Sequence, residues 1–152
     1  MMITLPPLLY IGLNLILITL IPQHAHSFCV YNQGEPGVLL TAEQIGGVDN
    51  TPMIRRFKQK KFMHPGDNIC CPYDYKDCSD VPDKNHPITL WLHFPNYHDT
   101  DPTGYDITGV AGGYIIVSGP VVQPKFEVFN ADHQSITFNL TQTLRTLGAY
   151  DT

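Results

Sequence analysis

The chain has 152 residues, with nine Lys or Arg, fourteen Asp or Glu and a formal net charge of −5. This length suits one domain with one hydrophobic core and argues against a multidomain protein. The mild acidic excess argues against nucleic acid as a partner, because proteins that bind it usually carry a strong basic excess.

The first predicted element is a secretory signal peptide over residues 1–27. Residues 1–21 contain no Asp, Glu, Lys or Arg, and the stretch LLYIGLNLILITLI is nearly all apolar. Ala25 and Ser27 place small residues where a signal peptidase cuts. An uncleaved membrane anchor is the alternative, but two early prolines and the lack of a flanking basic cluster disfavour it. We therefore expect a single secreted domain over 28–152, with no membrane contact after cleavage.

Three of the four cysteines lie in the stretch CCPYDYKDC, and the fourth, Cys29, follows the signal peptide. In an oxidising compartment four cysteines form two disulfides. A Cys70–Cys71 bond would close a strained ring, because neighbouring side chains of an extended strand point to opposite faces. One of these two therefore bonds Cys29 and the other Cys78, and both assignments stay open. Cys71 lies two residues after Ile69, so both side chains should point to the same face of the strand, and Ile69 should face inward. This favours Cys29–Cys70 with Cys71–Cys78. A zinc site with a nearby histidine is the rival interpretation.

Short runs rich in β-branched and aromatic residues predict an all-β fold. Thirteen prolines and twelve glycines leave little room for a long helix. One helical turn is expected at 41–47, a short C-terminal helical piece at 142–148 and a hairpin connection at 130–133. The near-regular spacing favours a compact antiparallel β-sandwich, or a barrel, stapled by two disulfides. The expected strands are residues 28–32, 37–41, 60–64, 88–94, 112–119, 125–130 and 135–141.

Alternation in the stretch ITLWLHF predicts which of its side chains face water. Its aliphatic residues and Phe94 share one face, and Thr89, Trp91 and His93 share the other. Phe129 is similarly placed on KFEVFN, so these four outward residues are a candidate aromatic platform for sugar rings. The alternative is that a second layer covers this face, because tryptophan is usually buried for most of its area.

The stretch SITFNLT predicts an exposed glycosylation site. Ile136, Phe138 and Leu140 should face inward, and the residues between them outward. Asn139-Leu140-Thr141 is an N-glycosylation sequon. Its acceptor, Asn139, is among the residues that should face outward, as attachment of a glycan requires.

Two charged segments are candidate sites for ions or ligands. The segment RRFKQKKF is either an anion-binding patch or an edge strand guarded by positive charge, and its basic residues are Arg55, Arg56, Lys58, Lys60 and Lys61. The segment DTDPTGYDITGV matches the first half of a calcium loop, with candidate ligands Asp99, Asp101, Thr103 and Asp106. Its twelfth position is Val110 where a glutamate should be, so a simple turn is the alternative. No other cofactor is expected.

Catalytic patterns are scarce. The sequence has no G-x-S-x-G elbow, and its cysteines are assigned to disulfides. Glu35, Glu43 and Glu127 are candidates for a glycosidase acid, but nothing in the sequence pairs them with a second carboxylate.

The order SFCVYNQ, PGDNICCPYDYKDC, GGYIIVSG and KFEVFNADH resembles a group of small secreted fungal proteins without assigned activity. The stretch FCVYNQ is also similar to the opening strand of thaumatin-like proteins, which have many more cysteines and a longer chain. The first resemblance implies a secreted, disulfide-stabilised β domain that acts at the cell wall or host surface. We therefore expect a non-enzymatic binding or effector-like protein whose partner is an extracellular glycan or a surface protein. A small secreted hydrolase acting on wall polysaccharide is the alternative.

Overall fold

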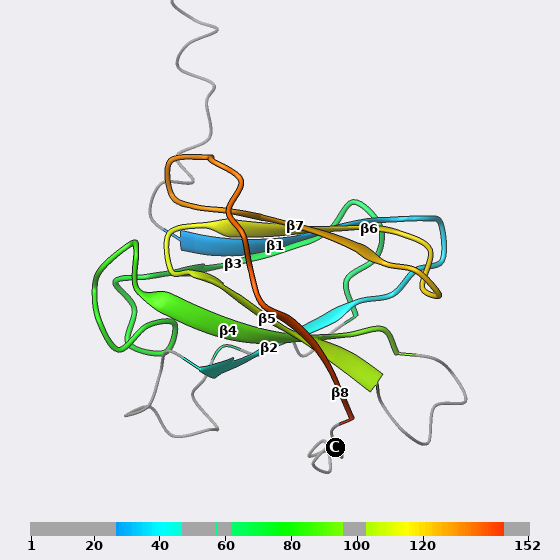
Figure 1. Cartoon of the computed structure of the whole chain (residues 1–152), viewed down its shortest axis with the longest axis horizontal. Coiled ribbons are helices and arrows are strands. Elements are labelled where there is room, and N and C mark those ends of the chain that lie inside the picture. Colours follow the sequence, from blue (N-terminus) through cyan, green and yellow to red (C-terminus); the bar gives the residue numbers. More distant parts are fainter. Residues whose placement is uncertain (1–26, 47–56, 58–61, 96–102, 145–152) are drawn as a thin grey trace, which may run out of the picture.

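The structure, a computed structural model, describes residues 27–46, 57, 62–95 and 103–144. These residues form two four-stranded sheets that pack face to face, as Figure 1 shows. The first sheet has the strand order β3-β1-β6-β7 and the second β2-β4-β5-β8. The prediction of an all-β fold with two packed sheets and two disulfides is confirmed. The strands are β1 (Ser27–Gly34), β2 (Thr41–Gly46), β3 (Asn68–Pro72), β4 (Pro87–His93), β5 (Thr103–Val110), β6 (Tyr114–Gly119), β7 (Lys125–Phe129) and β8 (Leu140–Leu144).

One strand pair departs from the antiparallel pattern that the sequence predicts. β1 and β6 run parallel, whereas the other paired strands are antiparallel. The chain reaches β6 from β5 in the second sheet, through a turn at 111–113. The amide of Cys29 donates to the carbonyl of Gly113 over 3.1 Å, so β6 begins beside the start of β1. Both strands therefore enter the first sheet from the same end.

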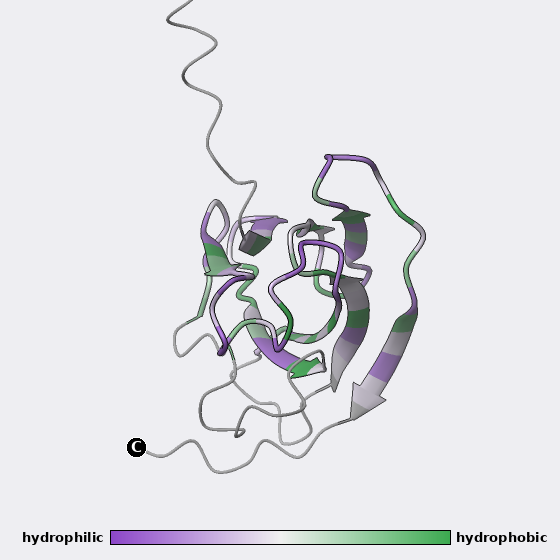
Figure 2. Cartoon of the chain, turned by 90° about the vertical axis from the view of Figure 1, so that its left-hand side faces the viewer, coloured by the Kyte–Doolittle hydropathy of each residue, from purple (hydrophilic) through white to green (hydrophobic). Residues whose placement is uncertain are grey.

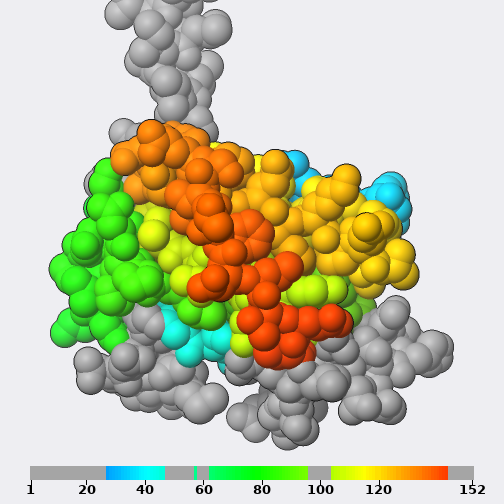
Figure 3. All heavy atoms as spheres, viewed as in Figure 1, coloured from blue at the N-terminus to red at the C-terminus, as the bar shows by residue number. Residues whose placement is uncertain are grey.

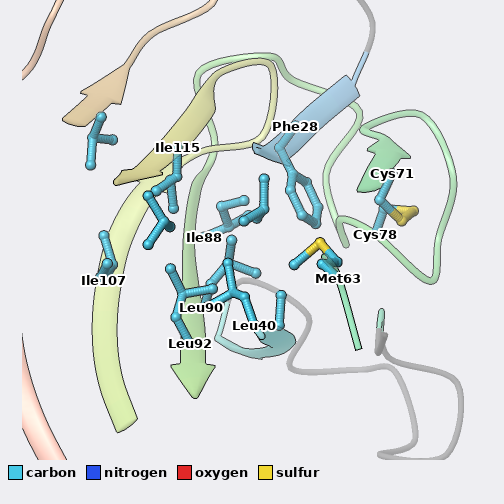
Figure 4. Close-up of a cluster of buried hydrophobic side chains, with 14 of the residues drawn as sticks. Phe28, Leu40, Met63, Cys71, Cys78, Ile88, Leu90, Leu92, Ile107 and Ile115 are labelled. Carbon is cyan, nitrogen blue, oxygen red and sulfur yellow. A yellow bond between two sulfur atoms is a disulfide. The ribbon is translucent and has the colours of Figure 1, made fainter. Parts of the chain in front are cut away.

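The hydrophobic core fills the space between the two sheets, and each strand from β1 to β7 contributes buried side chains from one of its faces. The aliphatic residues of β4 and the following Phe94 point inward, as alternation predicts, and Leu92 is fully buried. Phe28 of β1 and Ile115 of β6 meet them from the first sheet (Figure 4). Burying one such side chain contributes about 1.5–3 kcal/mol to folding. The core therefore depends on this alternation in both sheets.

Both disulfides attach to β3. Cys29 of β1 and Cys70 of β3 are directly opposite partners in the first sheet and are bonded to each other. The next residue, Cys71, is buried and bonds Cys78, which closes a polar loop. This is the pairing favoured by the expected inward orientation of Ile69 and Cys71, and it leaves no free cysteine. The zinc alternative is therefore wrong.

Two buried amides connect the strands to the loops around them. Asn32 is fully buried, and its Nδ2 donates to the carbonyls of Val38 and Met63 over 3.0 and 2.9 Å. Gln44 of β2 donates from Nε2 to the carbonyl of Cys78 over 2.8 Å. Because a buried carbonyl without a donor is costly, these amides fix the paths of the loops that they contact.

The structure corrects several predicted elements. Residues 41–46 form β2 and not a helical turn, because their backbone pairs with β4. Residues 142–144 belong to β8 and not to a helix, because they pair with β5. In the expected strand at 60–64, Met63 makes an isolated bridge to Leu40, and 60 and 61 lie outside the described residues. Within the described part of the chain, no helix has the length and apolar character of a membrane span.

Candidate functional site

The outer side of the first sheet carries a group of rings, here called the tyrosine cluster, in which Tyr31, Phe129 and His133 each lie against Tyr114. Tyr114 lies at its centre and stacks on Phe129, with ring centroids 4.6 Å apart and planes 12° apart. Tyr31 meets Tyr114 edge-on at 5.9 Å, and His133 lies 5.7 Å from the same ring. The three strand residues are half-buried and His133 is exposed. The cluster therefore presents apolar ring surface beside phenol and imidazole groups.

Alternation in three strands brings these rings to one face. Ile115 and Val128 point into the core, so their neighbours Tyr114 and Phe129 point outward. The register places Tyr114 directly opposite Phe129, where cross-strand side chains are close enough to stack. Tyr31 lies on β1, the other neighbour of β6. The arrangement of the cluster thus follows from the order of strands in the first sheet.

The Gly112-Gly113 turn allows Tyr114 to approach β7. A Cβ at Gly113 would collide with the carbonyl oxygen of Phe129, and one at Gly112 would lie 2.6 Å from the Cβ of Lys84. Glycine is required where two backbones come this close. The turn therefore determines how near Tyr114 lies to its stacking partner.

His133 is positioned by a tight turn between Asn130 and Ser135. Its backbone is left-handed, with a φ of 60°, a conformation that is uncommon outside glycine. The Oδ1 of Asn130 accepts hydrogen bonds from the amides of Asp132 and Gln134 over 3.0 and 2.9 Å. The turn predicted at 130–133 is therefore present, but the next strand, β8, joins the second sheet.

A surface ion pair ties this turn to the loop before β4. The Nζ of Lys84 lies 2.9 Å from Oδ1 of Asp132. The hydrogen bond to Asp132, followed by its charge, raises the pKa of Lys84. Exposed pairs contribute little to stability, so we assign this contact a role in positioning the turn.

Tyr31 remains a neutral phenol well above physiological pH. Partial burial, followed by the neighbouring Tyr114, raises the pKa of Tyr31 above its ordinary value of 10.0. Its hydroxyl therefore keeps its proton and can donate as well as accept a hydrogen bond.

Exposed polar residues border the cluster. Asn68 is the cross-strand partner of Tyr31, and Glu127 lies opposite Ile116 on the same outer face. Aromatic faces pack against the C–H groups of sugars, while polar neighbours bond the hydroxyls. This surface therefore combines half-buried aromatic rings with exposed polar side chains.

The predicted platform of Thr89, Trp91, His93 and Phe129 is wrong. Trp91 and His93 do lie on the outer face of the second sheet, but each is only 3% exposed, and their rings stack at 5.2 Å. Thr89 is half-buried, with its hydroxyl 3.4 Å from that of Thr108. Phe129 belongs to the other sheet. The alternative of a covered face is the correct one, because alternation determines the face of a side chain and not what lies over it.

Two carboxylates flank Trp91 on the second sheet. Glu43 of β2 and Asp106 of β5 are its directly opposite partners on either side. Two strand spacings separate them, which corresponds to about 10 Å between Cα atoms. The hydroxyl of Thr143 donates to Asp106 over 3.1 Å. The indole of Trp91 lies across Gly104, where a Cβ would collide with Nε1.

The second half of the predicted calcium segment is a strand, whereas a calcium loop would be irregular there. Thr103–Val110 forms the strand β5, in which Asp106 pairs with Trp91 and Thr141. Asp99 and Asp101 lie outside the described residues. Among the residues that are described, no group of three or more His, Cys, Asp or Glu could hold a metal.

The basic segment RRFKQKKF is described only at its two phenylalanines, so its five Lys and Arg residues lie outside the described part. Phe57 packs edge-on against Phe28, with ring centroids 5.0 Å apart. Its carbonyl accepts from the amide of Gln44 over 2.9 Å, and its amide donates to the carbonyl of Asp77 over 3.1 Å. Phe57 itself therefore lies beside β2. Phe62 is 53% exposed.

Asn139 is exposed and directly precedes β8, as a glycosylation acceptor should be. Ile136 and Phe138 pack partly buried against the core, as predicted. Leu140 does not, since it is 47% exposed on the last strand of the second sheet. Occupancy of the sequon stays a prediction.

Sequence reasoning missed Tyr31, Tyr114 and His133. Alternation in FCVYN and GGYIIVSG would have placed both tyrosines outward. Their proximity depends on the pairing of β1 with β6, which no local pattern reveals. Comparison with family models, curated proteins and solved structures finds no match to this chain.

Proposed function

We propose that this protein is an extracellular, non-enzymatic binding protein that binds sugar rings of a cell-wall or host-surface glycan on the tyrosine cluster. The observation that carries the proposal is the half-exposed stack of Tyr114 on Phe129, bordered by Tyr31 and His133. A protonated Tyr31 and the exposed His133 would bond sugar hydroxyls, while the rings would contact the apolar sugar faces.

The location outside the cell is part of the same proposal. Two disulfides are typical of oxidising compartments. The apolar leader, with small residues before Phe28, supports cleavage and export. N-terminal sequencing of protein from the culture medium should begin at Phe28. Recovery of Met1 in a membrane fraction would contradict export.

The binding test is retention of purified protein on insoluble wall polysaccharides, with Tyr114→Ala as the variant. Losing the central ring should weaken retention about tenfold, which corresponds to about 1.4 kcal/mol. The matched control is Tyr75→Ala, which removes a tyrosine that is 65% exposed in the Cys71–Cys78 loop. Equal retention of both variants, with unchanged far-ultraviolet circular dichroism, would show that the cluster is not the site.

The hydrolase alternative rests on Glu43 and Asp106 on either side of Trp91. Because Trp91 is 3% exposed, the surface between Glu43 and Asp106 offers a polysaccharide less aromatic ring area than the tyrosine cluster does. We expect the wild-type protein to release no reducing ends from wall polysaccharide. Release that disappears in both Glu43→Gln and Asp106→Asn would support the hydrolase instead.

A further inference from the structure

β8 is the last strand of the second sheet, and its sequence has an unusual symmetry. Its five residues, Leu140-Thr141-Gln142-Thr143-Leu144, read the same in both directions. They include no charged residue and no proline. Because an antiparallel pair of identical strands reverses one sequence against the other, a palindrome places identical residue types opposite each other throughout.

This strand is also accessible. Leu140 is 47% exposed, and Thr141 and Gln142 are exposed. In the described part of the chain, β8 pairs with β5 on one side and with no strand on the other. Figure 2 shows the last strand at the outer margin of the sandwich, and Figure 3 shows its atoms on the visible surface. Its outward edge therefore offers backbone donors and acceptors.

The other sheet edges carry features that oppose pairing. β7 exposes Lys125 and Glu127. β3 ends at Pro72, which has no amide hydrogen. β2 is followed along its edge by Phe57, which accepts from the amide of Gln44. Natural proteins guard sheet edges with charges, prolines and covering segments, and β8 has no charge or proline within the strand.

We propose that β8 pairs antiparallel with β8 of a second copy of this chain, about a twofold axis through Gln142. Thr141 would then face Thr143 of the partner subunit, and Leu140 would face Leu144 of the partner subunit. Cross-strand Thr–Thr pairs stabilise sheets, and a twofold interface uses the same patch on both subunits. The two second sheets would become one continuous sheet. This inference is independent of the proposed glycan binding.

The test is sedimentation velocity over a range of protein concentrations. All proteins carry Asn139→Gln, which prevents glycan attachment next to the strand and leaves its five residues unchanged. Because a short strand buries little area, we expect a weak, concentration-dependent dimer in this parent protein. A monomer at every concentration would overturn the proposal.

Charge variants at the axis test the register. Gln142→Lys places two ammonium groups opposite each other, so it should weaken dimerisation at least about tenfold, and Gln142→Glu should do the same. Mixing these two variants should restore a heterodimer, since opposite charges then meet. Gln123→Lys, on the exposed loop between β6 and β7, is the matched control and should dimerise like the parent. Dimers of Gln142→Lys as strong as the parent, or a mixture that stays monomeric, would overturn the pairing.

Discussion

Replacing Asn32 by alanine tests how much a single buried amide contributes to the fold. Its Nδ2 donates to the carbonyls of Val38 and Met63 over 3.0 and 2.9 Å, and its Oδ1 accepts from the amide of Gly34 over 3.0 Å. Alanine removes all three hydrogen bonds and leaves three backbone groups without this partner. Each lost bond costs about 1–1.5 kcal/mol, so we expect Asn32→Ala to lower the free energy of unfolding by about 3–4.5 kcal/mol.

Urea denaturation followed by tryptophan fluorescence measures this loss, because Trp91 is the only tryptophan and is 3% exposed in the folded state. The control is Asn68→Ala, which removes an exposed amide from β3 and should change stability by less than about 0.5 kcal/mol. A loss below about 1 kcal/mol for Asn32→Ala would refute the reasoning, because lost hydrogen bonds in a buried site cannot be so cheap.

Asn32→Asp separates hydrogen bonding from packing. It retains the size of the side chain but turns an acceptor toward the carbonyls of Val38 and Met63. Burial and these carbonyls should raise the pKa of the new carboxyl in the folded state above its ordinary value of about 3.9. The variant should therefore lose stability as the pH rises from about 4 through that raised pKa. Asn32→Ala should lack this dependence, and parallel pH profiles for the two variants would contradict it.

Removing Cys29–Cys70, with a sequence separation of 41, should destabilise the protein more than removing Cys71–Cys78, with a separation of 7. Loop-closure entropy gives losses of about 4 and about 2.4 kcal/mol, respectively. Urea midpoints of the two double Cys→Ser variants that ranked the other way would contradict this. Gly104→Ala should cost about 1–3 kcal/mol because its methyl group meets the indole of Trp91, and a melting temperature equal to wild type would count against the packing. Folding raises the pKa of Tyr31, so its neutral phenol contributes to the free energy of unfolding. This contribution is complete at a pH below the pKa in the unfolded chain and is lost as the pH rises through the pKa in the folded protein. Melting temperatures between about pH 9 and 11 should therefore fall more steeply for wild type than for Tyr31→Phe, and identical slopes would contradict the assignment.

The strands that the sequence predicts best have apolar residues at alternate positions, which point into the core. ITLWLHF is the clearest case, because Leu90 and Leu92 face the core as expected. Strands without that pattern were missed. NICCP contains the two adjacent cysteines, and TGYDITGV follows an Asp-rich segment that suggests a turn. Both are strands because neighbours in the sheets supply their backbone partners.

The candidate site was less predictable than the fold, because it depends on which strands are neighbours. Trp91 and Phe129 have the same outward parity, but they lie on different sheets. Tyr31 and Tyr114 are far apart in sequence and meet through the parallel pairing of β1 and β6. A local pattern reports the face of a strand, whereas a binding surface combines the faces of several strands.

The adjacent cysteines determine how the chain responds to cleavage. Cys29–Cys70 and Cys71–Cys78 close two covalent rings that lie next to each other in the sequence. A single protease cut inside either ring opens it without releasing a fragment. From Cys29 to Cys78, only the peptide bond between Cys70 and Cys71 would separate the chain in one cut. That bond lies within β3, where Cys71 pairs with Phe28 of β1. In a medium that contains proteases, the amino-terminal half of the domain thus stays in one covalent piece unless this paired strand is itself cut.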